Sequence, residues 1–145
     1  AEQHANRMRV AEQVLAAGST EAFWRAMLPN VVGPTTHAQR PEVVARVSEM
    51  MRDSRPNGVA GLQVAMANRP DSHADLAKFV GPVLCLRGAE DNIASATDHA
   101  NMVKSCKDAV AYEIDAAGHL APIEQAAETA AAIIDFLAKV KQPSC

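Results

Sequence analysis

The chain has 145 residues, a formal net charge of −3, and 48% hydrophobic but only 3% aromatic residues. This length suits one ordinary domain with an aliphatic core. No basic stripe is present that could neutralise nucleic-acid phosphates or bind an anionic membrane. No apolar run is long enough to span a bilayer, and no signal peptide is visible at Ala1.

The three cysteines do not form a disulfide framework. Cys85 lies inside an apolar run and is expected to be a small buried hydrophobe, while Cys106 and Cys145 lie near a helix end and at the last residue. No Cys-x-x-Cys or Cys/His spacing indicates a metal site. We therefore expect a reduced, cytoplasmic setting, with no metal and no cofactor.

The residues before Val80 carry helical patterns only. Apolar positions recur at helical spacing in five stretches, with Gly18 as a stop signal and Pro29 as the expected end of the second helix. A loop is expected at residues 29–36. The five predicted helices cover about residues 5–17, 20–28, 41–52, 57–67 and 71–78.

Two strand patterns follow. The continuous apolar run Val83–Leu86 suits a strand of a parallel sheet that is buried on both faces. Ser95 is expected to cap a helix, with Asp98 completing a partial capping box. Residues 110–115 alternate as in a strand near a sheet edge. A last helix after Pro122 is predicted to bury one apolar stripe, made of Ile123, Ala126, Ala127, Ala130, Ile133, Ile134 and Leu137.

The order of elements is therefore five helices followed by a β-α-β-α unit. A parallel pair of strands needs cover on both faces and leaves two unpaired edges. The fold class is α/β and helix-rich, and the unit is expected to be the end of a larger parallel sheet.

The two strands each end near a glycine and deliver a polar side chain. Gly88-Ala89-Glu90-Asp91 follows the first strand, and Gly118-His119 follows the second. Because the carboxyl ends of parallel strands lie at the same edge of a sheet, Asp91 and His119 can meet. The carboxylate would then accept a hydrogen bond from the imidazole and fix its tautomer, as in a Ser-His-Asp triad.

Other interpretations of these residues compete with the triad. Asp91 can be a turn or capping residue, His119 a loop histidine, and Glu90 is the other candidate acid. His99 lies on a helix stripe and is expected to pack, whereas His4, His37 and His73 are expected at the surface or in loops. Adjacent helical residues point in different directions, so Asp98 and His99 are not a metal pair.

Two further groups of residues carry both a functional and a structural interpretation. Trp24, Phe23 and four methionines can line a substrate pocket or simply pack the helices together; the methionines are Met27, Met50, Met51 and Met66. Glu113 and Asp115 are expected to be solvated.

Residues 83–137 resemble the C-terminal end of an α/β-hydrolase. The resemblance is carried by the strand-Gly-x-x-Asp element, the intervening helix, the histidine loop Gly118–Gln125 and the closing helix. The helices before Val80 resemble the cap of the esterase, enol-lactonase and proline-iminopeptidase branches. The expected organisation is thus a helical cap over residues 1–78 and the C-terminal βαβα part of the core over residues 79–145.

In this resemblance Asp91 is the triad acid and His119 the triad base. No serine of the chain lies in a Gly-x-Ser-x-Gly context, so the nucleophile is missing. The intact protein is expected to hydrolyse an ester or related acyl bond of a small-molecule substrate, and this chain alone is expected to be inactive. Its expected partner is the N-terminal half of the hydrolase or a second copy of this chain. The alternative function is a non-catalytic helical module for dimerisation or partner binding.

Overall fold

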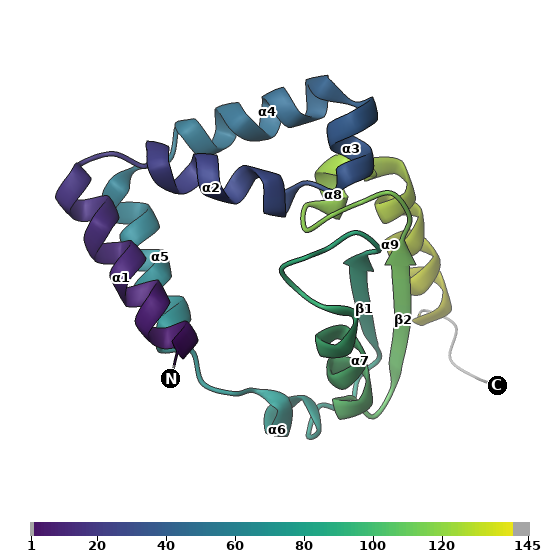
Figure 1. Cartoon of the computed structure of the whole chain (residues 1–145). Coiled ribbons are helices and arrows are strands. Elements are labelled where there is room, and N and C mark those ends of the chain that lie inside the picture. The colour runs from purple at the N-terminus through teal and green to yellow at the C-terminus, as the bar shows by residue number, and fades with distance from the viewer. Residues whose placement is uncertain (1, 141–145) are drawn as a thin grey trace. The chain divides into compact units, whose positions relative to one another are not determined.

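The computed structural model describes residues 2–140, and within them helices outnumber strands (Figure 1). By compactness these residues divide into two units, one of residues 2–28 and 45–71 and one of residues 29–44 and 72–140. The boundary between a cap and a core at residues 78 and 79 stays a prediction. No helix among residues 2–140 is long and apolar enough to cross a membrane.

The first unit is helical. Helix α1 (Glu2–Ala17) packs against α5 (Pro56–Ala67), and the contact buries small and β-branched residues: Ala11, Val14, Val59 and Ala60. Gly18 ends α1 with φ of +59°, a conformation that glycine adopts without strain, as its position predicted. Helix α4 (Pro41–Arg52) has the predicted bounds, and along it Val47 is buried while Met50 is exposed.

Two predictions about residues 29–36 were wrong. Helix α2 (Glu21–Val31) continues through Pro29, and a short helix α3 (Pro34–Gln39) replaces part of the predicted loop. Val31 and Val32 are buried, so packing outweighs the hydrogen bond that proline cannot donate. Pro34 at the first position of α3 suits a helix start, because its missing N–H has no partner there anyway.

The second unit contains the sheet. Strands β1 (Val83–Gly88) and β2 (Ala109–Ile114) pair in parallel, from Val83 opposite Ala109 to Gly88 opposite Ile114. Helix α7 (Ala96–Ser105) connects them and packs on both. The short helices α6 (His73–Leu76) and α8 (Ala121–Glu124) precede β1 and follow β2. The core of the unit consists of Ile114, Ala117, Ala121 and Ala132, with Leu86 packed against them.

The last helix differs from the prediction in both extent and orientation. It begins at Ala126, after α8, and runs to Val140 as α9, which packs on β2 (Figure 1). Its buried residues are Thr129 and Ala132, whereas Ile133, Ile134 and Leu137 are exposed. The predicted buried stripe is therefore largely on the outside. The helix has apolar residues on both sides, and the face of Thr129 and Ala132 is the buried one.

Candidate active site

Asp91 lies just beyond the end of β1, in a loop that is hydrogen-bonded to the chain after β2. The backbone N–H of Ala89 donates to Ile114 at 2.9 Å, and that of Glu90 donates to Ala117 at 2.8 Å. The Asp91 side chain is only 5% exposed. Its Oδ1 accepts N–H groups from Ile93 at 2.8 Å and from Ala94 at 3.0 Å, which leaves Oδ2 for another donor.

The environment of Asp91 favours the carboxylate. Burial alone raises the pKa of Asp91. Hydrogen bonds from the N–H groups of Ala94 and Ile93 and from His119, together with the charge of His119, lower this pKa by more than burial raises it. The net pKa is therefore below the usual value. Asp91 is therefore ionised at neutral pH and can only accept hydrogen bonds.

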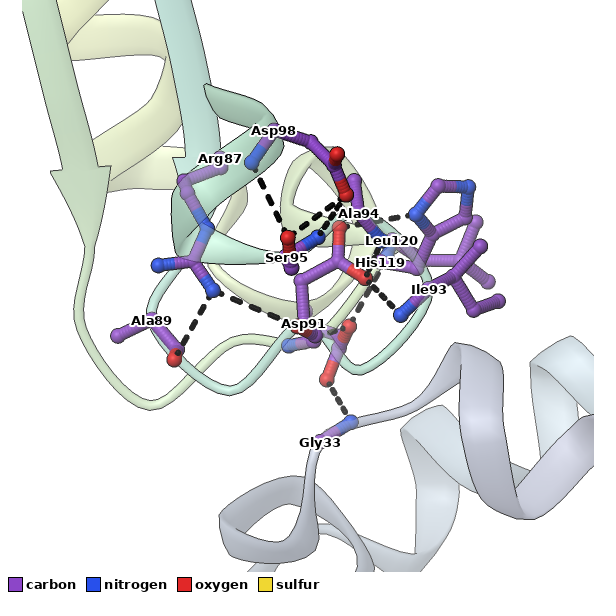
Figure 2. A network of polar contacts seen from close by, with 12 residues as sticks. Gly33, Arg87, Ala89, Asp91, Ile93, Ala94, Ser95, Asp98, His119 and Leu120 are labelled. Atoms are coloured by element: carbon purple, nitrogen blue, oxygen red, sulfur yellow. Dashed lines mark hydrogen bonds and ion pairs between the residues drawn. The ribbon is translucent and has the colours of Figure 1, made fainter. Parts of the chain in front are cut away.

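His119 meets the free oxygen of Asp91, as the sequence predicted. Its Nδ1 lies 2.9 Å from Asp91 Oδ2, and its side chain remains 41% exposed (Figure 2). Because the carboxylate cannot donate, Nδ1 must carry a proton, and in the neutral imidazole Nε2 then carries the lone pair. The loop that delivers this imidazole turns at Ala116, which has φ of +50°.

Arg87 supports the acid loop from inside β1, a role that sequence reasoning missed. Its side chain is 8% exposed, and its guanidinium pairs with Glu113 of β2. The guanidinium also donates to the carbonyl groups of Ala89 and Asp91, both at 3.4 Å (Figure 2). Glu113, which was predicted to be solvated, is 53% exposed and also pairs with Arg87. The signal in the sequence was a lone arginine at the end of an apolar run, which needs an acceptor when it is buried.

Ser95, the serine nearest to the acid in sequence, has the predicted capping role. It begins α7, accepts the Asp98 N–H at 3.0 Å, and donates its hydroxyl to Asp98 Oδ2 at 2.7 Å. This is a reciprocal capping box. The hydroxyl is therefore committed to the helix start, with a carboxylate of α7 as its acceptor.

Cys85 is a poor substitute nucleophile. It is 2% exposed, and burial, with a further contribution from the neighbouring Cys106 thiol, raises the pKa of its thiol. The neutral thiol reacts far more slowly than the thiolate. Cys85 is thus a buried packing residue, as its apolar surroundings predicted.

A cavity of about 370 Å³ opens beside the Asp91–His119 pair. Most of its wall is apolar. His99, predicted to be a packing histidine, is partly buried in this wall and lies 2.9 Å from the Cys85 carbonyl through Nε2. The lining residues are Leu86, Arg87, Gly88, Asp91, Ala94, Asp98, His99, Met102, His119, Ala121 and Pro122. His119 thus borders a space that is mainly hydrophobic.

Two glutamates near the pair, the partly buried Glu90 and the buried Glu124, make contacts that the sequence did not predict. Glu90, considered as the alternative acid, accepts the N–H of Thr35 at 2.9 Å and also the Thr35 hydroxyl. Glu124 accepts three backbone N–H groups around the histidine loop.

Within residues 2–140 no group of His, Cys, Asp and Glu side chains could hold a metal ion. Trp24 is buried and lies beneath the guanidinium groups of Arg25 and Arg52, in the first unit.

Comparison with solved structures identifies the class of fold. The chain is 33% identical to a thermophilic esterase from Thermogutta terrifontis, with a TM-score of 0.91 over 97% of this chain and 52% of the esterase. A hydrolase from Pseudomonas aeruginosa is 25% identical, with a TM-score of 0.82 over 92% of this chain and 50% of that one. An enol-lactonase from Burkholderia xenovorans is 22% identical, with a TM-score of 0.80 over 90% of this chain and 49% of the enol-lactonase.

No protein-family model matches the chain, and no curated protein matches its sequence. The chain spans about half the length of the solved structures that it matches. It therefore has the fold of part of an α/β-hydrolase, a helix-rich piece with two parallel strands, and the predicted fold class is confirmed.

Proposed function

We propose that this chain carries the acid and base of a Ser-His-Asp triad, and that the complete enzyme hydrolyses an ester or related acyl bond. The observation that carries the proposal is the 2.9 Å contact between His119 Nδ1 and the buried carboxylate of Asp91, next to a largely apolar cavity. The 33% identity to an esterase supports an ester as the class of substrate.

In the proposed reaction His119 is the general base. Its Nε2 takes the proton of a serine hydroxyl while the serine oxygen attacks the acyl carbon, and Asp91 stabilises the imidazolium that forms. His119 then protonates the leaving alcohol, and an acyl-enzyme remains. Water deprotonated by the same Nε2 attacks this ester, releases the acid and regenerates the serine.

The serine must come from outside these 145 residues, because none of their serines lies in a Gly-x-Ser-x-Gly context. We propose that the N-terminal half of the hydrolase supplies it by adding a strand to β1. Val83 and Ala89 donate their backbone N–H groups toward β2. In a parallel strand the backbone N–H groups of alternate residues point to opposite sides. The N–H groups of Leu84 and Leu86 therefore point to the other edge of β1, which has no strand beside it in residues 2–140.

The proposal is tested with the chain alone and with the full product of its gene. Reading the gene upstream of Ala1 should reveal a Gly-x-Ser-x-Gly, and the longer protein should hydrolyse p-nitrophenyl acetate. His119→Ala in the longer protein should then lose roughly three or more orders of magnitude in kcat. His4→Ala, which removes an exposed histidine of α1, is the matched control and should keep full activity. The chain alone should show negligible turnover.

A second candidate is a non-catalytic module that dimerises. It is favoured by one observation, the exposed apolar stripe of α9 with Ile133, Ile134 and Leu137. An inactive long protein, or a gene with no serine motif, would contradict the hydrolase proposal. A concentration-dependent dimer in light scattering that Ile134→Glu dissociates would then support the module.

Turnover by the chain alone that Ser95→Ala abolishes would overturn our assignment of the nucleophile to another segment.

A further inference from the structure

Glu124 is a buried carboxylate whose observed partners are all backbone N–H groups. It is 1% exposed. Its Oε1 accepts the N–H groups of Gly118 at 3.0 Å and Leu120 at 3.1 Å, and its Oε2 accepts that of Gly33 at 2.8 Å. Burying a carboxylate is costly unless hydrogen bonds replace its hydration. Here two of those hydrogen bonds hold the backbone N–H groups of the residues on either side of His119.

Helix capping explains only part of this arrangement. Leu120 precedes the first residue of α8, and a glutamate early in a helix can accept the N–H at the start of that helix. Gly118 lies outside the helix, however, and Gly33 lies 91 residues away in sequence. Glu124 therefore connects the histidine loop to a separate segment, which a capping role does not require.

The segment around Gly33 is pressed against the histidine loop. A Cβ on Gly33 would lie 2.8 Å from the Gly118 nitrogen, and a Cβ on Gly118 would lie 2.9 Å from the carbonyl carbon of Val32. Side-chain atoms do not approach backbone this closely, so both positions need glycine. The Glu124 carboxylate accepts from both glycines and thereby holds the two backbones in contact.

The same segment is also bonded to the acid loop. Glu90, the residue before Asp91, accepts the N–H and the hydroxyl of Thr35, and its own N–H donates to Ala117. Residues 33–35 thus contact the acid loop through Glu90 and the histidine loop through Glu124. Figure 2 shows Gly33 bonded into the polar network that contains Asp91 and His119.

We propose that Glu124 is a positioning residue: it holds the histidine loop against residues 33–35 and so keeps His119 Nδ1 on Asp91. The inference deepens the proposed hydrolase function and depends on it for its catalytic meaning. Glu124→Gln tests it with minimal change of shape. The amide oxygen of the glutamine can accept either from Gly118 and Leu120 or from Gly33. The –NH₂ group then faces the remaining backbone N–H donors and cannot accept from them.

The main readout is the protonation pattern of the His119 ring, measured on the chain by ¹H–¹⁵N NMR at a pH where the ring is neutral. The chain should show a single tautomer with its proton on Nδ1 and a downfield Nδ1–H signal. Glu124→Gln should lose that downfield signal and give a mixture of tautomers, with unchanged helix content by circular dichroism. Glu128→Gln, at a partly exposed carboxylate of the next helix, is the matched control and should leave the ring unchanged.

Thr35→Val keeps the experiment informative if Glu124→Gln does not fold. It removes a single hydroxyl from the other contact of the segment, and the downfield signal should weaken. An unchanged His119 ring in folded Glu124→Gln, or in Thr35→Val if the first variant is unfolded, would overturn the proposal.

The NMR readout does not depend on turnover. If the longer protein proves inactive, the hydrolase proposal fails while the positioning of His119 by Glu124 is still decided. If the longer protein is active, Glu124→Gln should lower kcat and leave KM nearly unchanged, because the base and not the substrate cavity is displaced.

Discussion

Replacing Asp91 by asparagine isolates the charge that orients His119. The amide oxygen can still accept the N–H groups of Ile93 and Ala94, so the loop keeps its shape. The –NH₂ group then faces Nδ1 and donates to it, which forces the ring proton to Nε2. In the neutral ring Nε2 would thus lose its lone pair, as the histidine of a Ser-His-Asp triad does when its acid is replaced by an amide.

The cost in stability follows from the same contacts. A hydrogen bond to a charged group contributes about 1.5–3 kcal/mol, and partial exposure of the imidazole reduces this, so we expect Asp91→Asn to destabilise the chain by about 1–2 kcal/mol at pH 7. The pKa of Asp91 is lowered by folding. The carboxylate therefore stabilises the folded chain above its unfolded pKa of about 3.9, and this contribution disappears as the pH falls through the folded pKa.

Urea unfolding between pH 3 and pH 7 measures the effect. The difference between the chain and Asp91→Asn should be largest near pH 7 and shrink below about pH 4, at the unfolded pKa. Asp135→Asn removes an exposed aspartate of α9 and should show no such dependence. Equal stability of Asp91→Asn at pH 7, together with a His119 ring still protonated at Nδ1, would refute the reasoning.

Two further predictions concern backbone contacts near the site. Gly88→Ala should destabilise the chain by about 1–3 kcal/mol in urea unfolding, because its Cβ would lie 2.6 Å from the carbonyl carbon of Ala117. The control Gly61→Ala has open space around its Cβ in α5 and should stabilise the chain by about 0.5–1 kcal/mol. The opposite order of stability would contradict the observed close approach at Gly88. Ser95→Ala should cost about 1 kcal/mol through loss of the α7 cap. Hydrogen exchange that is unchanged at the start of α7 would contradict this assignment.

The positions of Asp91 and His119 could be predicted because local patterns determine them. An apolar run that ends in glycine indicates a strand and its end, and parallel pairing brings two such ends to the same edge. The contact at 2.9 Å follows from that geometry without knowledge of the rest of the chain. The capping role of Ser95 was equally local, since its partner Asp98 is three residues away.

Contacts across long sequence separations could not be predicted in this way. Glu124 looks like an ordinary polar residue in the first turn of a helix, and its partner Gly33 lies in a stretch that was expected to be a loop. The exposed face of α9 was missed for a different reason. Both sides of that helix carry apolar residues, so periodicity alone cannot select the face of Thr129 and Ala132 over that of Ile133 and Ile134.

Among residues 2–140, the observed contacts that orient Asp91 and His119 lie inside the second unit. Asp91 is held by Ile93, Ala94 and Arg87, while backbone hydrogen bonds and the Glu124 carboxylate tie the loop of His119 to its neighbours. None of these contacts requires a nucleophile. In the proposed enzyme a serine needs only to arrive at Nε2 of a ring whose tautomer is already fixed by Asp91. The orientation of the ring would then precede assembly of the complete triad, and the NMR signal of Nδ1–H should be the same in this chain and in the longer protein.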